Sequence, residues 1–397
     1  MLGGTEGRAV AVTGIGLVTC CGIGKEAFWD GLNSTPPDGT ERRVEGFDPT
    51  PYFGPKEVRR VDRFQQFAVA AAEEALAEVG GFEAIGADPD RSGVVIGTGV
   101  GGLETLEDQV IVRYEKGARR VSPFLVPMMM ANAASAGVSM RFGFRGPCET
   151  TVTACAAGTH SVGNAARLIA MGRCDVMLAG GSEAAMTPTA IAGFGNMTAL
   201  SSSGVSRPFD VDRDGFVIAE GAAVLLLEEL SMARARGARI YAVILGSASN
   251  ADAHHITAPS PGGAGAAACI ELALADAGVS AGDVGHINAH GTSTPLNDAA
   301  EAEAIAKVFG APGPPVTSIK GVTGHALGAA GAIEAAALAL SIDKGLIPPT
   351  AGFQHTDPEI HLDVVAGSAR SWSPAPALSN SFGFGGHNGC LVMAPAP

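Results

Sequence analysis

Short runs of strongly apolar residues alternate along the chain with longer segments in which Ala and Leu recur at helical spacing. Apolar runs of a few residues bounded by Gly are typical of buried strands, whereas apolar residues every three or four positions predict helices. The predicted strands are 9–13, 91–97, 175–179, 221–228, 239–246, 286–289, 315–318 and 389–393. The clearest predicted helices are 63–79, 160–171, 265–277, 298–308 and 326–344. This alternation predicts an α/β protein with strands layered against helices.

The chain contains a weak internal symmetry. An N-terminal half, residues 1–237, and a C-terminal half, residues 238–397, each contain strands, a long Ala-rich helix and Gly-rich turns. The division follows Arg236-Gly237. We expect two related halves packed into one compact unit.

The composition is that of a tightly packed enzyme-sized protein. The 397 residues are 46% hydrophobic and 17% charged and include 55 Gly, which excludes a disordered or coiled-coil chain. The most apolar stretches, such as 221–227 and 329–342, fall short of the roughly 18 uninterrupted apolar residues of a membrane span. The first eight residues lack the basic and apolar regions of a secretion signal.

The net charge restricts the binding partners of the protein, and the cysteines indicate its cellular compartment. A net charge of −14 argues against nucleic acid or an anionic membrane as the main partner, because both require a broad basic face. The cysteines are odd in number and form no CxxC pair, so neither a disulfide framework nor a structural zinc site fits. We therefore expect the protein to be located in a reducing cytoplasm. The seven cysteines are 20, 21, 148, 155, 174, 269 and 390.

The segment 97–102 matches the glycine pattern GxGxxG after a predicted strand. A dinucleotide site would also need a second strand that ends in an acid for the ribose, but the following helical stretch runs into Arg119-Arg120-Val-Ser-Pro. A close-packed glycine turn fits better, and we predict no nucleotide cofactor.

Cys155 lies at a predicted strand-to-helix elbow. It follows the β-type run 149–154 and opens an Ala/Gly-rich helical stretch. The positive end of a helix favours a thiolate, and its unpaired N–H groups can hold a developing oxyanion. This placement suits acyl-thioester chemistry, although an unpaired cysteine is more often a small buried hydrophobic residue.

Three further segments supply partners for such a cysteine. His290 ends an apolar strand and enters a loop rich in hydroxyl groups, and His325 follows Lys320 by five residues at a second strand-to-helix junction of small residues. The segment 379–388 is an aromatic, Gly-rich loop that can present backbone N–H groups and move a ring across a tunnel mouth.

In combination these segments resemble the β-ketoacyl synthases, the thiolase-fold condensing enzymes of fatty-acid and polyketide assembly, and in particular their elongating Cys-His-His type. The resemblance covers nearly the whole chain. The motifs that carry it are TAC at 153–155, HGTSTP at 290–295, KxxxGH at 320–325 and NSFGFGG at 380–386. It implies a five-layered αβαβα thiolase-like fold and a dimer.

The resemblance also implies catalytic roles. Cys155 would accept the acyl chain from a carrier-protein thioester, while His290 and His325 would hydrogen-bond the malonyl thioester oxygen. Lys320 would be an orienting electrostatic group with Glu334 as its carboxylate partner and Asp298 and Glu301 in support. The remaining implied roles are an oxyanion hole from the backbone N–H groups of Cys155 and Phe384, gating by Phe382 and Phe384, phosphopantetheine binding by Thr292 and Thr294, and an acyl pocket at Val100. Glu334 could instead be a structural acid with a polar or monovalent-cation partner.

The implied reaction is a decarboxylative Claisen condensation of the Cys-bound acyl chain with malonyl-acyl-carrier protein in fatty-acid elongation. The phosphopantetheine belongs to the carrier, and no metal or prosthetic group on this chain is implied. Expected partners are acyl- and malonyl-loaded carrier proteins and a second subunit, in a homodimer or a heterodimer with a chain-length-factor-like protein. Carriers are acidic, so a local basic patch would dock them; the candidates are arginines 42, 43, 59, 60, 63, 119, 120 and 207.

Alternatives remain at this point. A ketosynthase of a type II polyketide synthase would share every catalytic residue. A catalytically silent chain-length subunit would lack the nucleophile, and a thiolase acting on coenzyme A would want a second reactive cysteine, for which Cys390 is poorly placed on a predicted strand. Initiating enzymes pair Cys with His and Asn, so His325 favours elongation. The sequence leaves acyl length, branching and unsaturation open.

Overall fold

The computed structural model describes residues 8–37 and 39–397. Residues 1–7 lie outside the described residues. They belong to the predicted N-terminal half and to the segment that was inspected for a secretion signal. Within the described residues one large mixed sheet runs through the molecule in the order β11-β10-β14-β15-β9-β1-β8-β6-β4-β5. The N-terminal half contributes β1 (Val10–Thr19), β4 (Ser92–Gly97), β5 (Cys148–Glu149), β6 (Val176–Glu183) and β8 (Gly221–Glu229). The C-terminal half contributes β9 (Ala242–Ala251), β10 (His286–Asn288), β11 (Val316–Thr317), β14 (Ala377–Gly383) and β15 (His387–Ala394).

The two halves have the same topology. When the five strands of each half are numbered in chain order, their order from the centre of the sheet outward is first, fifth, fourth, second and third in both halves. In each half the fifth strand pairs antiparallel with both its neighbours, and the outer three strands are parallel. The halves meet where β1 and β9 pair antiparallel, with Val10 opposite Ile244. This repetition confirms the prediction of two related halves.

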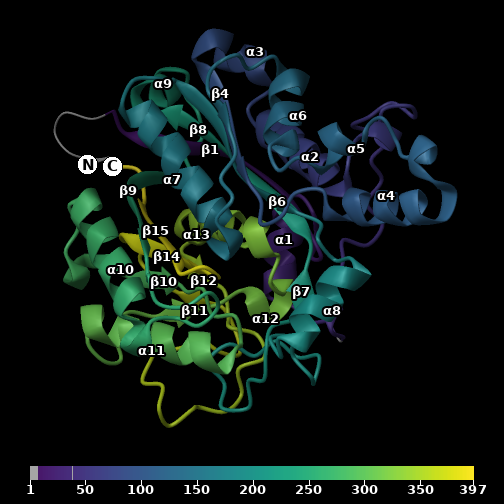
Figure 1. The fold of residues 1–397 in the computed structure, drawn as a ribbon. Helices are drawn as coiled ribbons and strands as arrows, with labels where there is room; N and C mark the ends of the chain where they lie inside the picture. The colour runs from purple at the N-terminus through teal and green to yellow at the C-terminus, as the bar shows by residue number, and fades with distance from the viewer. Residues whose placement is uncertain (1–7, 38) are drawn as a thin grey trace.

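Helices complete five layers (Figure 1). Helices α2 (Arg63–Ala77) and α6 (Ala133–Phe142) pack on the N-terminal half of the sheet, and α10 (Ala264–Ala277) and α11 (Pro295–Phe309) pack in the C-terminal half. The layer between them contains α7 (Ala157–Ala170) and α13 (Ala330–Lys344), which contact each other and strands of both halves. Residues 330–342 of α13 are all buried, which explains why that segment is apolar on every side. The predicted thiolase-like architecture of αβαβα layers is thus present.

No described helix combines the length and apolarity needed to cross a bilayer.

Shorter elements connect these layers. The predicted boundary at Gly237 falls in the connection between α9 and β9. The remaining helices and strands are β2 (Gly22–Ile23), α1 (Lys25–Leu32), β3 (Glu41–Arg42), α3 (Phe82–Ile85), α4 (Leu103–Lys116), α5 (Leu125–Met129), α8 (Pro188–Asn196), β7 (Ile218–Ala219), α9 (Leu230–Ala235), α12 (Lys320–Thr323), β12 (Leu346–Ile347) and β13 (Arg370–Ser371).

Two segments differ from the sequence-based prediction, and both adjoin Cys155. The β-type run 149–154 forms a strand only at Cys148–Glu149, because the chain then leaves the sheet to enter the elbow. The predicted loop 379–388 is mostly a β-hairpin, in which β14 and β15 pair from Ala377–Met393 to Gly383–His387. Ser, Asn and Gly are poor strand formers on an exposed sheet, but here they face the closely packed central helices.

Candidate active site

Cys155 lies at a strained turn that points its side chain into the protein. Ala154, directly before it, has a left-handed φ of 49°, and residues 154–156 form a single 3₁₀ turn before α7 begins. A non-glycine residue in this region is costly and is held in place by its surroundings. The Cys155 residue is 8% exposed. The predicted elbow is therefore present, with its sulfur buried at the start of the central helix.

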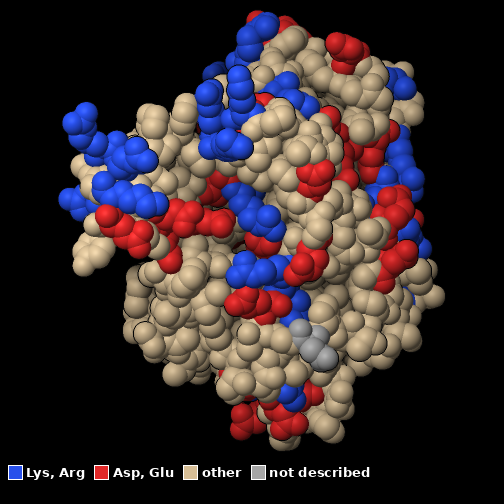
Figure 2. Space-filling model, turned by 90° about the vertical axis from the view of Figure 1, so that its right-hand side faces the viewer, with Lys and Arg blue, Asp and Glu red and all other residues tan. Residues whose placement is uncertain are grey.

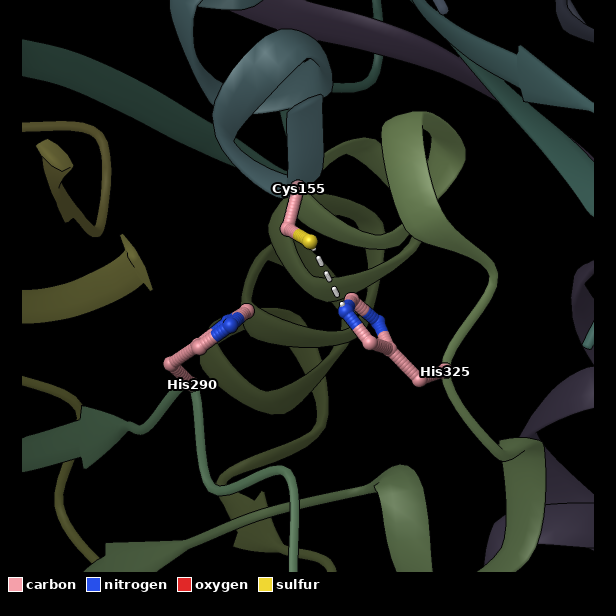
Figure 3. A group of neighbouring side chains, drawn as sticks. All are labelled: Cys155, His290 and His325. Carbon is pink, nitrogen blue, oxygen red and sulfur yellow. Dashed lines mark hydrogen bonds between the residues drawn. The ribbon is translucent and has the colours of Figure 1, made fainter. Parts of the chain in front are cut away.

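Two histidines meet the sulfur from the C-terminal half (Figure 3). His325 Nε2 lies 3.0 Å from Cys155 Sγ, and the rings of His290 and His325 stand nearly perpendicular with centroids 5.4 Å apart. One ligand atom from each of the three side chains lies within 4.8 Å of the other two. The structure thus brings together three side chains that are up to 170 residues apart in the chain.

A buried ion pair lies beside the histidines. The ammonium group of Lys320 pairs with Glu334, and both side chains are 1% exposed. Lys320 Nζ also donates to the backbone oxygen of His290 at 2.6 Å and lies 3.3 Å from the Nδ1 of that ring. The partner expected for Lys320 is therefore the partner found, and the pair fixes a positive charge next to the imidazole of His290.

Asp298 and Glu301 act on the backbone of the histidine loop. Glu301 accepts hydrogen bonds from the N–H groups of His290 and Gly291 at 2.8 and 2.7 Å. Asp298 accepts from the N–H groups of Phe209 and Ser293 at 2.8 and 3.2 Å. Both carboxylates are buried and hold the loop in shape, which places them as positioning residues.

Burial controls the charge of the three central side chains. It raises the pKa of the Cys155 thiol to about 11, although Lys320 and the Phe384 N–H act in the opposite direction. The same burial, aided by Lys320, holds the pKa of His290 and of His325 well below the ordinary value. The effect of burial on the Cys155 thiol therefore outweighs any stabilisation of a thiolate by the helix end. A neutral thiol faces neutral imidazoles, and His325 Nε2 is placed to accept its proton.

The hairpin turn supplies a backbone donor at the sulfur. The Phe384 N–H is hydrogen-bonded to the Cys155 thiol. A Cβ at Gly383 would lie only 3.1 Å from the Cys155 nitrogen, so the turn and the elbow are in close contact at this position. The two N–H groups predicted to form the oxyanion hole, those of Cys155 and Phe384, are therefore neighbours.

A cavity of about 550 Å³ opens onto these groups. The proposed phosphopantetheine residues Thr292 and Thr294 line it, with their hydroxyl oxygens 2.9 Å apart. The Phe382 ring lies 5.9 Å from the His290 ring, and Phe382 and Phe384 both line the cavity. Val100 is half exposed and also lines it.

Sequence reasoning missed two residues of this site. Glu183 is completely buried and accepts hydrogen bonds from Gly99 N at 2.6 Å and Gly328 N at 3.0 Å, and its pKa is raised by burial to about 7. The Phe216 ring packs against His325 at 5.3 Å between centroids. An acid at the end of the apolar strand 176–183 was a usable signal for Glu183. Phe216 ends the segment 206–216, which also resembles the β-ketoacyl synthases, but the sequence gives no reason to place its ring against His325.

Other candidate groups have structural partners. His160 bridges Thr153 and the Asn388 carbonyl at 2.8 and 3.0 Å, as expected for a core histidine. Cys390 lies fully buried in β15, which agrees with its rejection as a second reactive thiol. All seven cysteines are free thiols.

A second group of possible metal ligands combines the buried Asp210 with the exposed Asp212 and His355. The Asp210 carboxylate already accepts the N–H groups of Asp212, Gln354 and His355 at 2.7 to 2.9 Å. This group is explained by loop structure and gives no reason to propose a metal.

The fold and the Cys-His-His geometry define a thiolase-like enzyme with a cysteine nucleophile. Family models named β-ketoacyl synthase, N-terminal domain, and β-ketoacyl synthase, C-terminal domain, match residues 33–233 and 241–354. A 3-oxoacyl-(acyl-carrier-protein) synthase 2 from Synechocystis sp. is 45% identical over 98% of both chains. The chain belongs to the β-ketoacyl synthase family.

Solved structures show the same relationship. The ishigamide ketosynthase/chain length factor is similar with a TM-score of 0.92 and 35% identity, over 98% of this chain and 100% of that chain. A type II polyketide synthase acyl-carrier protein in complex with its ketosynthase bound to the hexaketide matches with a TM-score of 0.90 and 35% identity, over the same shares of the two chains.

Proposed function

We propose that this chain catalyses the decarboxylative Claisen condensation of a Cys155-bound acyl chain with malonyl-acyl-carrier protein, which elongates fatty acids by one two-carbon unit. The observation that carries the proposal is the 3.0 Å contact between Cys155 Sγ and His325 Nε2, with His290 beside it at the end of the cavity. The names of the curated relatives support the same reaction and pathway.

In the first half-reaction Cys155 Sγ attacks the thioester carbonyl of the acyl-carrier protein. Its proton passes to His325 Nε2 and then to the leaving phosphopantetheine thiol, so no net proton is gained or lost. The negative charge on the tetrahedral oxygen is held by the N–H groups of Cys155 and Phe384. The product is an acyl-Cys155 thioester and a free carrier thiol.

In the second half-reaction the bond between the malonyl methylene carbon and its carboxylate breaks, and CO2 leaves. The electron pair becomes an enolate whose oxygen receives hydrogen bonds from His290 and His325. Because burial and Lys320 keep both imidazoles neutral, each can donate an N–H hydrogen bond to the enolate oxygen without carrying positive charge at rest. The enolate carbon then attacks acyl-Cys155 to form the β-ketoacyl-carrier protein, the Cys155 thiolate leaves, and it takes up one proton from solvent, so this half-reaction consumes one proton in total.

The carrier brings the phosphopantetheine, and we propose that this chain needs no cofactor of its own. Thr292 and Thr294 are suited to bind the arm by their position on the cavity wall. Gating by Phe382 and Phe384 and acyl binding at Val100 are proposed on the same ground.

The carrier docks, in this proposal, on a basic surface made of Arg59, Arg60, Arg119 and Arg120. All four are exposed, and within residues 8–37 and 39–397 none forms an ion pair. The Arg60 guanidinium lies 4.6 Å from the Phe124 ring centroid. This contact brings the pair Arg59–Arg60 close to the segment that follows Arg119–Arg120. Figure 2 shows the face that carries α4 and α5, where basic side chains gather in groups beside acidic ones.

The other candidate arginines are less suitable for docking. Arg42 is 2% exposed, Arg43 pairs with Glu41, and Arg63 pairs with Glu220. Of the eight candidate arginines, we therefore assign only the four residues of the basic surface to docking. Arg207 is half-buried and is not part of this surface.

A second candidate function is the ketosynthase of a type II polyketide synthase, working with a chain-length partner subunit. Solved structures with a chain length factor and with a carrier protein favour it, whereas the curated relatives at higher identity favour fatty-acid synthesis. The subunit partner is accordingly a second copy in the first proposal and a chain-length-factor-like protein in the second. In either case we place the enzyme in a reducing cytoplasm, in keeping with its free thiols.

The test is intact-mass analysis after incubation with acyl-carrier proteins of graded chain length. Wild type is expected to gain one acyl group, which malonyl-carrier protein discharges as a β-ketoacyl product. Cys155→Ala should gain none, and Cys148→Ala, which changes an exposed cysteine, should behave as wild type. A folded wild type that never acylates, with or without a partner subunit, contradicts the proposal.

A further inference from the structure

Cys20 and Cys21 form the two-residue tip of a β-hairpin. Strands β1 and β2 pair with Thr19 opposite Gly22, so the two cysteines alone make the turn. A side-chain hydrogen bond joins the two thiols.

Surrounding groups hold the pair in position. Cys20 Sγ lies 3.8 and 3.7 Å from the backbone oxygens of Val322 and Thr323, the last residues of α12. Cys21 packs against Gly31 of α1, where a Cβ would lie 2.5 Å from the Cys21 Cβ. Both cysteine residues are partly exposed, unlike the buried Cys155, Cys174, Cys269 and Cys390.

The two thiols differ in acidity. The hydrogen bond from Cys20 lowers the pKa of Cys21, with a further contribution from Thr19, against the effect of burial. The same interaction, together with burial, raises the pKa of Cys20 well above its ordinary value. Cys21 is therefore the better nucleophile, and Cys20 is a protonated thiol beside it.

A direct disulfide fits this pair poorly. Disulfides usually join Cα atoms about 4.4–6.8 Å apart, whereas consecutive Cα atoms lie about 3.8 Å apart. A bridge through one additional atom relieves that constraint. The other cysteines that influence each other electrostatically, Cys269 and Cys390, are both 0% exposed and offer no comparable access.

We propose that Cys20 and Cys21 form a bidentate binding site for soft, thiophilic ions that take two sulfur ligands, represented by trivalent arsenic. With phenylarsine oxide the two S–H bonds and the As=O bond are replaced by two S–As bonds, and one water is released. No oxidant or reductant is needed. The first S–As bond makes the second intramolecular, which strengthens retention by about a hundredfold over a single thiol.

The test uses the full chain and phenylarsine oxide at one equivalent, followed by excess glutathione and intact-mass measurement. Wild type should retain one phenylarsenic group less two hydrogens, and dimercaptopropanol should remove it. Cys20→Ser and Cys21→Ser should each lower retention by about a hundredfold. Cys155→Ser and Cys269→Ser should retain the group as wild type does, which separates this site from the catalytic cysteine.

Peptide mapping of the wild type alone provides a second readout that does not depend on how variants fold. Trypsin cleavage after Arg8 and Lys25 releases a peptide that contains both cysteines, and the arsenic should be found on it. Absence of a glutathione-resistant adduct in wild type, an adduct on another peptide, or undiminished retention in both folded serine variants would overturn the proposal.

Discussion

At the scale of single residues, one buried ammonium group controls two opposite properties of the site. Lys320 lowers the pKa of the Cys155 thiol and also lowers the pKa of His290 and His325. A positive charge favours a neighbouring thiolate and disfavours a neighbouring imidazolium. The lysine therefore assists formation of the nucleophile and keeps both histidines as neutral donors, while Glu334 balances its charge.

The acidity of Cys155 gives a prediction about pH. With a pKa of about 11, the thiolate fraction should rise with pH throughout the range from 7 to 10, because the ionised form is the one that reacts. Iodoacetamide labelling of Cys155, followed by peptide mass, should accelerate about tenfold per pH unit over this range, since each unit below the pKa reduces the thiolate tenfold. Lys320→Met should slow labelling further. A plateau near pH 8.5 in wild type contradicts this assignment.

The Lys320–Glu334 pair gives a prediction about stability. Glu334→Gln leaves a buried ammonium without its carboxylate, which should lower the free energy of unfolding by about 3–5 kcal/mol. The double variant Lys320→Met, Glu334→Gln should lose less than the sum of the two single changes. Urea unfolding at pH 8 measures all three. The exposed pair Arg239–Asp343 provides the control, since Asp343→Asn should cost less than about 1 kcal/mol.

At the scale of elements, small residues let the two central helices approach closely enough to place Cys155 and His325 in contact. A Cβ at Gly158 in α7 would lie 2.5 Å from the Ala332 nitrogen in α13. A Cβ at Gly331 would lie 2.2 Å from the Thr159 hydroxyl and 2.7 Å from its nitrogen. All three distances are far below ordinary van der Waals contact, so larger side chains would push the two halves of the site apart.

We therefore predict that Gly331→Ala lowers stability by about 1–3 kcal/mol through overpacking and slows acylation of Cys155. Gly193→Ala in α8 is the matched control, because nothing lies within 4 Å of its added Cβ and alanine is the better helix former. Thermal unfolding and the acylation rate are the two measurements. Equal effects of both substitutions would show that the helix contact does not position the cysteine.

At the scale of the whole molecule, the sequence predicts those parts whose cause is local or whose motif is specific. The apolar run 92–97 and the helix Arg63–Ala77 depend on periodicity, and the Cys155 elbow and its two histidines depend on motifs. Strand 389–393 was predicted and is part of β15, but β14 and its pairing with β15 were missed because Ser, Asn and Gly are weak strand formers by themselves. The neutral state of Cys155 was also missed, since it depends on burial by both halves at once.

Net charge and docking also belong to this scale. The chain carries −14 overall, so an acidic carrier is repelled except where a basic surface faces it. We predict that Arg119→Glu, Arg120→Glu raises KM for the carrier protein about tenfold or more with little change in kcat, because the rim charges act on encounter and binding. Higher salt should reduce the kcat/KM of wild type more than that of the variant.

The control for docking reverses two arginines that already have partners in the structure. Arg141 pairs with Glu73 and Arg145 pairs with Asp90, so Arg141→Glu, Arg145→Glu changes the net charge equally without touching the basic surface. Steady-state kinetics with malonyl- and acyl-carrier protein at two salt concentrations compare the pair of variants. If both double variants raise KM alike, overall charge governs association and the basic surface has no special role. If only the Arg119→Glu, Arg120→Glu variant raises KM for the carrier protein, the carrier approaches the cavity from the side of α4.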